Sequence, residues 1–435
     1  MSSEWKNRLL SEIVEINPKR TIKKGETTPF IDMAALPINS RDVNVAICSR
    51  EYKGGGSKFQ NGDTLVARIT PCLENGKTAL INCLSDNTIA HGSTEFIVLA
   101  ARDQREFQFV YYLARSDPFR SYAIARMEGT SGRQRVPNIA VGDYEFFCPP
   151  ADQRVAIGRF LANLDDRITL LREINKTLEA IAQAIFKSWF VDFDPVRAKM
   201  EGRQPEGMDE ATAALFPDSF EESELGLVPK GWKTSSLAES CSYLKRGLSP
   251  KYLEKGGVLV LNQKCVRDFS IDFRKARRHD NSQRAIDGRT LEVGDVVVNS
   301  TGVGTLGRVA QVLDLPETTI ADSHLTIVRA GSTMSPAYLG EWMQKNQTLI
   351  ESMGEGTTGQ TELSRAKLGK LRLLAPPSAI QLKFSKIVQP LKSKSVVNSH
   401  TSASLEAIRD TLLPRLISGQ LRLPEAQEQI ENALT

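Results

Sequence analysis

One glycine pattern in the sequence could bind a nucleotide. Gly302, Gly304 and Gly307 match GxGxxG and follow the β-branched run at 295–300. A dinucleotide site needs the third glycine to open a helix whose N-terminus meets the pyrophosphate. Residues 308–312, with the composition RVAQV, are typical of a strand instead. We therefore expect a tight hairpin here and no nucleotide site.

Other motifs of catalysis are missing from the sequence. It has no P-loop, GxSxG, HExxH or EF-hand loop, and it lacks the Asn-Pro-Pro-aromatic motif of adenine methyltransferases. The six Cys form no CxxC pair and the four His are scattered singly, so the spacing of metal ligands is absent too. We expect no catalytic, cofactor-binding or metal-binding residue in this chain.

Three polar segments could contact DNA: residues 68–77, residues 129–135 and the cation-rich run around 267–289. Lys and Arg bind phosphates, while Arg and Gln can pair with the edges of guanine and adenine. Ordinary solvated loops have the same composition, so both interpretations remain open. The candidate DNA-binding residues are Arg68, Thr70, Lys77, Arg133, Gln134, Arg135, Lys264, Arg267, Arg274, Lys275, Arg277, Arg278, Arg308 and Gln360.

The elements that must position these residues occur twice in the chain. Four segments recur at the same offset of 227 residues: Trp-Lys at 5 and 232, a GT(S/T)G loop at 129 and 356, Pro-Pro at 149 and 376, and LEAI at 178 and 405. One shared register at four places indicates a duplication. The β-branched runs at 63–70 and 295–300 predict strands, and 107–125 and 336–353 predict helices. We expect an α+β fold with two duplicated domains.

A long helix is predicted after each Pro-Pro. Apolar residues recur there at alternating steps of four and three, with Asn175 and Asn398 in the seam. Each helix would span roughly 38 residues, or about 57 Å, which is too long to pack on its own domain. We expect the two helices to form an antiparallel coiled coil with pseudo-two-fold symmetry. The residues assigned to helix pairing and subunit docking are Leu164, Ile168, Leu171, Leu178, Ile181, Ile185, Trp189, Leu391, Leu405, Ile408, Leu412 and Leu416.

Composition and charge complete the domain plan. The chain has 435 residues, 40% hydrophobic and 25% charged, which is ordinary for globular domains. No apolar run approaches the ~18 residues of a membrane span, and the N-terminus does not resemble a secretory signal, so we expect a cytoplasmic protein. The predicted parts are a first domain at 1–150, a helix at 151–190, an acidic, Pro-containing linker at 191–229, a second domain at 230–377, a helix at 378–420 and a tail at 421–435.

The charges are distributed unevenly. The formal net charge is +4, yet residues 191–229 carry a net charge of −7 and residues 230–376 one of +6. The acidic segment thus hides the positive charge of the second domain in the net charge of the chain. Such a basic surface is typical of proteins with a polyanionic partner.

Several segments resemble the specificity subunit of type I DNA restriction-modification enzymes. Residues 178–199 are similar to the central helical region of that family, 215–232 to its entry into the second half, and 411–419 to its C-terminal helical end. The Pro-Pro followed by Gln153 or Gln381 resembles the junction between a target-recognition domain and its helix, although that Gln is shifted by one residue between the copies. In the globular parts the resemblance is architectural only.

The resemblance implies a non-catalytic chain whose two target-recognition domains read a bipartite, asymmetric site in double-stranded DNA. It also implies partners: two methylation subunits that dock on the helices and use S-adenosylmethionine, and two restriction subunits that use ATP and Mg²⁺. Two other functions stay open, namely a specificity module of a methylation-only or other phage-defence complex, and a coiled-coil scaffold that does not bind DNA.

Overall fold

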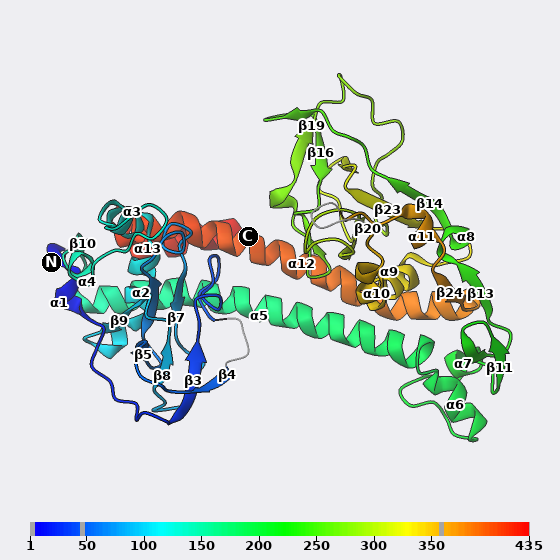
Figure 1. The fold of residues 1–435 in the computed structure, drawn as a ribbon, viewed down its shortest axis with the longest axis horizontal. Helices are drawn as coiled ribbons and strands as arrows, with labels where there is room; N and C mark the ends of the chain where they lie inside the picture. Colours follow the sequence, from blue (N-terminus) through cyan, green and yellow to red (C-terminus); the bar gives the residue numbers. More distant parts are fainter. Residues whose placement is uncertain (1–4, 44–47, 356–360, 435) are drawn as a thin grey trace. The chain divides into compact units, whose positions relative to one another are not determined.

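The protein, seen here as a computed structural model, folds into two compact units (Figure 1). The structure describes residues 5–43, 48–355 and 361–434. Unit 1 comprises Met1–Arg172 and His400–Thr435, and unit 2 comprises Glu173–Ser399. Two helices of 40 residues each, α5 (Ala151–Phe190) and α12 (Ser378–Ile417), contribute to both units. The predicted α+β class with long helices is confirmed.

Unit 1 contains two four-stranded sheets, with the strand orders β2-β9-β6-β7 and β4-β3-β8-β5, and a separate β1-β10 pair. Neighbouring strands are antiparallel except β3 and β8, which are parallel. The strands are β1 (Lys6–Leu9), β2 (Val14–Ile16), β3 (Thr27–Ile31), β4 (Cys48–Glu51), β5 (Ser57–Phe59), β6 (Thr64–Ala67), β7 (Thr78–Leu80), β8 (Ala90–Gly92), β9 (Phe96–Ala101) and β10 (Glu145–Cys148). The short helices are α1 (Leu10–Ile13), α2 (Phe107–Arg115), α3 (Asp117–Ala125) and α4 (Asn138–Gly142).

Unit 2 contains sheets with the orders β14-β23-β20-β21 and β15-β19-β16-β22, and the pairs β13-β24, β11-β12 and β17-β18. The strands are β11 (Phe220–Ser223), β12 (Gly226–Pro229), β13 (Lys233–Ser236), β14 (Cys241–Arg246), β15 (Tyr252–Leu253), β16 (Val258–Leu261), β17 (Val266–Arg267), β18 (Ser270–Ile271), β19 (Arg277–His279), β20 (Val296–Asn299), β21 (Val309–Gln311), β22 (Thr319–Ala321), β23 (Leu325–Ala330) and β24 (Arg372–Ala375). The short helices are α6 (Asp194–Met200), α7 (Glu210–Ala213), α8 (Leu237–Ser240), α9 (Pro336–Lys345), α10 (Gln347–Ser352) and α11 (Arg365–Gly369).

The core of each unit forms where a helix covers the central strands. In unit 1, Val110 and Tyr112 of α2 are buried with Val66 and Ile97 of β6 and β9. In unit 2, Leu339 of α9 belongs to the same buried cluster as Val296 and Val328 of β20 and β23. The strands are rich in β-branched and apolar residues that suit a buried, pleated surface. The sheets therefore provide the rigid base from which the connecting loops extend.

Residues 191–229 differ from the predicted linker, because they fold into unit 2. They contain α6, α7 and the β11-β12 hairpin. Val196 and Phe216 are 0% and 1% exposed, and the Phe216 ring lies 5.3 Å from the Trp189 ring. The acidic and Pro-rich composition predicts an exposed linker. The packing instead depends on a few apolar side chains between the charged ones, and these are buried.

The segment predicted as a tail also packs onto its unit. It contains α13 (Leu423–Leu434), and Leu421 and Ala426 are buried in the core of unit 1. Gly419 has a φ of +76°, and a Cβ atom there would lie 2.8 Å from the Trp5 ring. Glycine thus allows the chain to turn closely over Trp5. The guanidinium of Arg422 then lies 5.1 Å from the centroid of the same ring.

Candidate nucleic-acid interface

The same turn precedes the central strand of each unit. In unit 1, the Gln60 backbone N–H donates to Asp63 Oδ2 at 2.7 Å, and the Gly62 N–H donates to the carbonyl of Ile81. In unit 2, the Glu292 N–H donates to Asp295 Oδ2 at 2.8 Å, and the Gly294 N–H donates to the carbonyl of Val312. Burial raises the pKa of Asp63, and Arg20 opposes that shift. Each turn fixes the position at which its strand, β6 or β20, begins. The strand then leads directly into the candidate DNA-binding loop that follows it.

Two of the predicted DNA-binding loops lie side by side in unit 1. Ile69 and Arg135 form an antiparallel bridge, and the Val136 N–H donates to the carbonyl of Arg68 at 3.0 Å. The Thr70 N–H donates to the carbonyl of Gln134, also at 3.0 Å. Segments about 60 residues apart in sequence therefore form one surface. The candidates Arg68, Thr70, Arg133, Gln134 and Arg135 all lie in these two adjoining segments.

The cationic side chains on this surface differ in whether they are already bound to other protein groups. Arg135 forms a bidentate ion pair with Glu95, with Nη2 2.7 Å from Oε1, and this hydrogen bond raises the pKa of Arg135. The Nζ of Lys77 donates to the carbonyl of Met33 at 2.7 Å. Arg133 is exposed, and the Nε of Arg68 is buried without a hydrogen-bond partner among the described residues. Arg135 and Lys77 thus hold the loops, whereas Arg133 is available to a ligand.

Unit 2 repeats this arrangement of loops. Thr301 and Glu362 form an antiparallel bridge, and the Leu363 N–H donates to the carbonyl of Ser300 at 2.8 Å. The loop around Lys264 joins the same surface, because Asn299 Nδ2 donates to the carbonyl of Gln263 at 3.1 Å. The guanidinium of Arg308 donates to the carbonyl of Gly304. Gln360 lies outside the described residues.

The glycine pattern at 302–307 forms a loop between antiparallel strands β20 and β21, so the prediction of a hairpin is confirmed. Gly307 has a φ of +82°, and a Cβ atom there would lie 2.5 Å from the Cα of Glu351. The third glycine therefore serves a close backbone approach, and no helix opens at this position.

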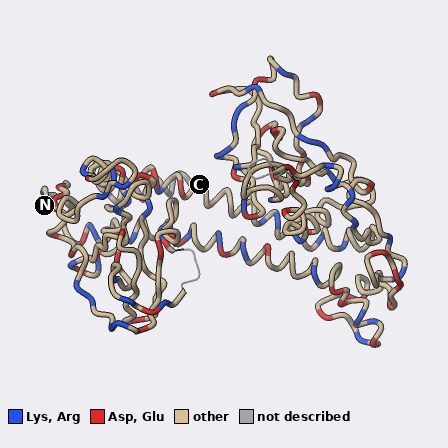
Figure 2. The backbone as a smooth tube through the Cα atoms, viewed as in Figure 1, with Lys and Arg blue, Asp and Glu red and all other residues tan. Residues whose placement is uncertain are grey.

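Much of the cationic run at 267–289 is paired with carboxylates. Arg274 lies 2.9 Å and Lys275 3.4 Å from Asp272, and Arg278 lies 2.6 Å from Glu317. Arg267 lies 3.4 Å from Asp268. Such exposed pairs stabilise little and can exchange for a phosphate, but they reduce the positive field that the sequence suggested. Figure 2 shows Lys and Arg interspersed with Asp and Glu along the backbone of both units.

Arg277 lies over an aromatic ring, and none of the ion pairs among the described residues involves it. Its guanidinium lies 3.4 Å from the centroid of Tyr252. A guanidinium stacked on a ring is pre-oriented at little cost, and its edge stays free to donate hydrogen bonds. Within the run, Arg277 is thus the cation best placed for a phosphate.

The residues assigned to the helix seam divide between the two units. Leu164, Ile168 and Leu405 form one buried cluster, with Leu171 and Ile408 packed against it. Leu412 and Leu416 enter the core of unit 1. In unit 2, Trp189 is buried in the core and Ile185 and Leu391 pack against it, while Leu178 is half-buried.

Ile181 is the exception, because its side chain is 43% exposed while Ala182 and Phe186 are buried. A straight helix of 3.6 residues per turn drifts from a strict heptad repeat. The buried face has therefore moved by one residue from the predicted seam.

Two asparagines meet in the helix seam of unit 2. Asn398 Nδ2 donates to Asn175 Oδ1 at 2.9 Å, and Asn175 Nδ2 donates to the carbonyl of Ser395 at 3.0 Å. Asn398 is only 2% exposed. A buried amide pair of this kind is satisfied in a single register of the two helices.

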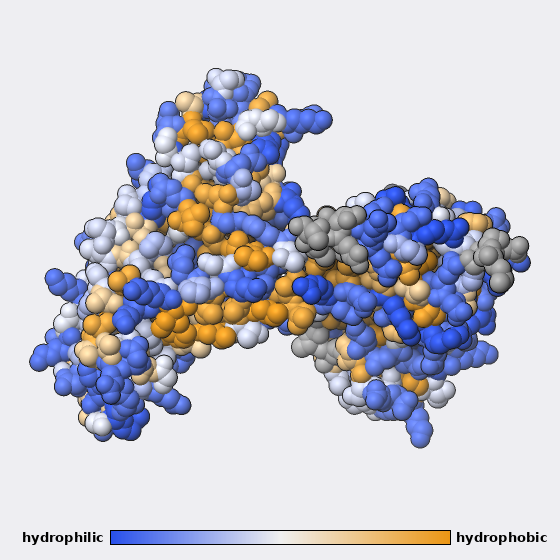
Figure 3. All heavy atoms as spheres, turned by 180° about the vertical axis from the view of Figure 1, so that it is seen from behind, coloured by the Kyte–Doolittle hydropathy of each residue, from blue (hydrophilic) through white to orange (hydrophobic). Residues whose placement is uncertain are grey.

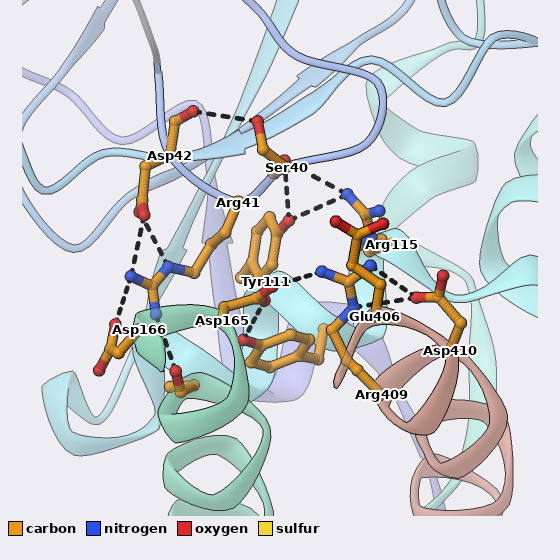
Figure 4. A network of polar contacts seen from close by, with 12 residues as sticks. Ser40, Arg41, Asp42, Tyr111, Arg115, Asp165, Asp166, Glu406, Arg409 and Asp410 are labelled. Carbon is orange, nitrogen blue, oxygen red and sulfur yellow. Dashed lines mark hydrogen bonds and ion pairs between the residues drawn. The ribbon is translucent and has the colours of Figure 1, made fainter. Parts of the chain in front are cut away.

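A polar network attaches the first domain to the helices within unit 1 (Figure 4). Asp165 of α5 accepts a hydrogen bond from the Tyr112 hydroxyl at 2.6 Å and pairs with Arg409 of α12. Arg41 lies 2.6 Å from Asp166. Burial alone would lower the pKa of Arg41 and Arg409, but their aspartate partners raise it. Sequence reasoning missed this network, because its partners are distant in sequence.

The described residues include no group of three or more His, Cys, Asp or Glu side chains that could hold a metal ion. Among the same residues, the search for a helix with both the length and the apolarity to span a membrane finds none.

The chain is similar to proteins of one kind. Residues 2–180 match the family model of the type I restriction modification DNA specificity domain. The type I restriction enzyme HindI specificity subunit of Haemophilus influenzae is 24% identical over 472 residues, which cover 96% of this chain and all of that protein. The EcoEI specificity subunit of Escherichia coli is 24% identical over 491 residues, covering 94% and 82%.

A solved structure shares the fold. The crystal structure of the type I restriction-modification system S subunit from M. genitalium matches with a TM-score of 0.58 and 16% identity, over 96% of each chain. The chain thus matches the specificity domain over residues 2–180, is similar along nearly its whole length to type I restriction enzyme specificity subunits, and shares the fold of a solved S subunit.

Proposed function

We propose that this chain is the DNA-binding subunit of a type I restriction-modification complex and reads a bipartite, asymmetric site in double-stranded DNA. One observation carries the proposal: each unit builds a similar loop surface on a sheet of matching strand order, yet with different side chains. The loop residue Arg68 of unit 1 corresponds to Ser300 of unit 2, since each carbonyl accepts the equivalent backbone hydrogen bond. Two domains with the same strand order but different loop side chains suit two half-sites of different sequence.

The long helices are proposed to form an antiparallel coiled coil with pseudo-two-fold symmetry. Two sets of contacts support this: Arg172 of α5 lies 2.6 Å from Glu406 of α12 in unit 1, and Asn175 meets Asn398 in unit 2. From the first contact to the second, the residue number rises along α5, from 172 to 175, and falls along α12, from 406 to 398, as expected for antiparallel helices.

The helices are also the proposed docking surface for two methylation subunits, with two restriction subunits completing the complex. Unit 2 leaves apolar helix residues exposed: Ile174 is 36%, Ile181 43%, Leu382 57% and Val397 55% exposed. Figure 3 shows hydrophobic surface gathered on one face of the molecule. Exposed apolar surface of this kind is typical of protein interfaces. S-adenosylmethionine, ATP and Mg²⁺ would then be used by the partners, while this chain supplies recognition.

The test is to co-express the chain with the methylation subunit of its own host and to map methylated adenines in genomic DNA. We expect one motif with two defined parts separated by an undefined spacer. As a control, the purified chain alone should transfer no methyl group from labelled S-adenosylmethionine. Methylation without a shared motif, or transfer by the isolated chain, would contradict the proposal.

A further inference from the structure

Unit 2 contains a cationic pocket that lies outside the predicted DNA-binding residues. It is formed by α8, β14, α11 and the start of β24 and has a volume of about 670 Å³. Leu244 and small residues form its apolar wall, and four cations line it: Lys245, Arg365, Lys370 and Arg372. The corresponding signal in the sequence is a group of four cations within eight residues: Arg365, Lys367, Lys370 and Arg372.

The carboxylates around this pocket are engaged either by cations outside it or by Arg372. Glu362 lies 2.7 Å from Arg246, and Glu355 pairs with Lys367. Arg372 pairs with Glu224.

Glu239 lies 3.9 Å from Arg372, and its carboxylate also accepts the Ser236 N–H at 2.8 Å. Among the described residues, the pairs around the pocket thus leave Lys245, Arg365 and Lys370 without a carboxylate.

Positive charge accumulates here as a result. Burial lowers the pKa of Arg246, and the neighbouring charge of Arg365 lowers it further, against the effect of Glu362. The Nζ of Lys245 lies 5.3 Å from the centroid of the Tyr243 ring. Three unpaired cations around one hollow favour an anion with several acceptor oxygens.

The first domain has the same backbone frame without these charges. Leu9 pairs with Glu145 across β1 and β10, as Ser236 pairs with Arg372 across β13 and β24. At this offset of 227 residues, Arg365 and Lys370 correspond to Asn138 and Asp143. A register shift in β14 moves the next counterpart by one residue, so that Lys245, opposite Ile327, corresponds to Asn17, which is hydrogen-bonded to Val98. The fold therefore does not require the cations, and their presence in one copy points to a ligand of that copy.

We propose that this pocket binds a backbone phosphate of the DNA, next to the half-site that unit 2 reads. The inference rests on the proposed function. The pocket is continuous with the candidate interface, because α11 begins two residues after Leu363, whose N–H donates to Ser300. Arg246 connects the two surfaces, with Nη2 2.7 Å from Glu362 Oε1 and 2.9 Å from the carbonyl of Leu363. The guanidinium of Arg365 and the ammonium of Lys370 suit phosphate oxygens.

The experiment measures binding of the full-length chain to a duplex that carries the mapped site, at a series of salt concentrations. The variants are Arg365→Gln and Lys370→Gln. The matched control is Lys367→Gln, which removes the same charge from the same helix but from a side chain that does not line the pocket. Each lost phosphate contact should make the slope of log K against log salt shallower by about 0.9. We expect that change in both pocket variants and an unchanged slope in the control.

The outcomes separate this inference from the proposed function. If the wild-type chain does not bind duplex DNA, the proposed function itself is contradicted. If the wild-type chain binds but the pocket variants keep its slope and their thermal unfolding midpoint, the pocket inference is wrong and DNA recognition stands.

A titration with inorganic phosphate completes the design. If the pocket variants lose phosphate binding without any change in the DNA slope, the ligand is a free phosphate compound, and the assignment to DNA is overturned. If the variants lose only their association with the methylation subunit, an acidic protein segment occupies the pocket, and the inference fails as well.

Discussion

At the scale of single residues, the interface separates cations that position loops from cations that are free to bind. Arg135 and Glu95 are 40 positions apart in the sequence, and Arg278 and Glu317 are 39 positions apart. No local pattern in the sequence reports such pairs. Sequence reasoning could therefore find the basic segments but could not tell which cations in them are already neutralised.

The pair of Arg135 and Glu95 gives a direct test of a positioning role. If Arg135 holds the 128–135 loop through Glu95, then Glu95→Gln should weaken DNA binding about as much as Arg135→Gln, on the order of 10-fold. The double variant should be no worse than either single one. If Arg135 instead reads a base, Glu95→Gln would retain wild-type affinity while Arg135→Gln would not.

The buried pair of Asp165 and Arg409 should stabilise unit 1 strongly. Their side chains are 4% and 3% exposed. Among the ion pairs of the described residues, Asp165→Asn leaves the buried Arg409 charge with the more exposed Asp410. We therefore expect a loss of about 3–5 kcal/mol in the free energy of unfolding. Asp166→Asn is the matched control, since that side chain is 58% exposed, and it should cost less than about 1 kcal/mol. Urea unfolding would measure both, and equal losses would show that burial does not decide the effect.

At the scale of elements, periodicity was informative and composition was misleading. The alternation of apolar residues predicted both long helices, because a helix of 40 residues must keep one face buried. The seam near Ile181 was predicted wrongly by one residue, since α5 does not follow a strict heptad there. The acidic stretch at 191–229 suggested a linker, yet Val196 and Phe216 anchor it in the core. In this segment the burial of a few apolar side chains decides the structure. The mean charge of the segment does not reveal which side chains are buried.

The asparagine pair of the helix seam should set its register at a cost in stability. Asn398→Leu alone leaves Asn175 Oδ1 without its donor, so the free energy of unfolding should fall by about 1–2 kcal/mol. Replacing both asparagines by Leu removes the unsatisfied group and should recover that loss or exceed the wild type. Urea unfolding of the three variants tests this. A double variant less stable than Asn398→Leu would mean that the amides contribute more than register.

At the scale of the whole molecule, the chain combines two domains of similar strand order with two long helices that contribute to both units. Each unit combines one domain with parts of both α5 and α12. The polar anchors differ between the units: Tyr112 and Asp165 meet in unit 1, and Glu341 and Lys392 lie 2.6 Å apart at the corresponding place in unit 2. The two units thus have sheets of matching strand order, while the polar contacts that attach each domain to the helices differ.

This organisation predicts that the domains can be exchanged as modules. Replacing residues 1–150 by the corresponding domain of a relative should change one part of the methylated motif and leave the other, because each loop surface is built within its own unit. The donor must keep or receive Trp5, Arg41, Glu106 and Tyr112. These side chains contact Gln153, Asp166, Arg154 and Asp165 on α5, all beyond the junction.

The reciprocal exchange of residues 230–377 is the control and should change the other part alone. Methylation mapping of both chimaeras reads the result directly. A chimaera that assembles and methylates, but with both parts of the motif altered, would mean that recognition by one domain depends on the other. The separate loop surfaces would then not be separate readers.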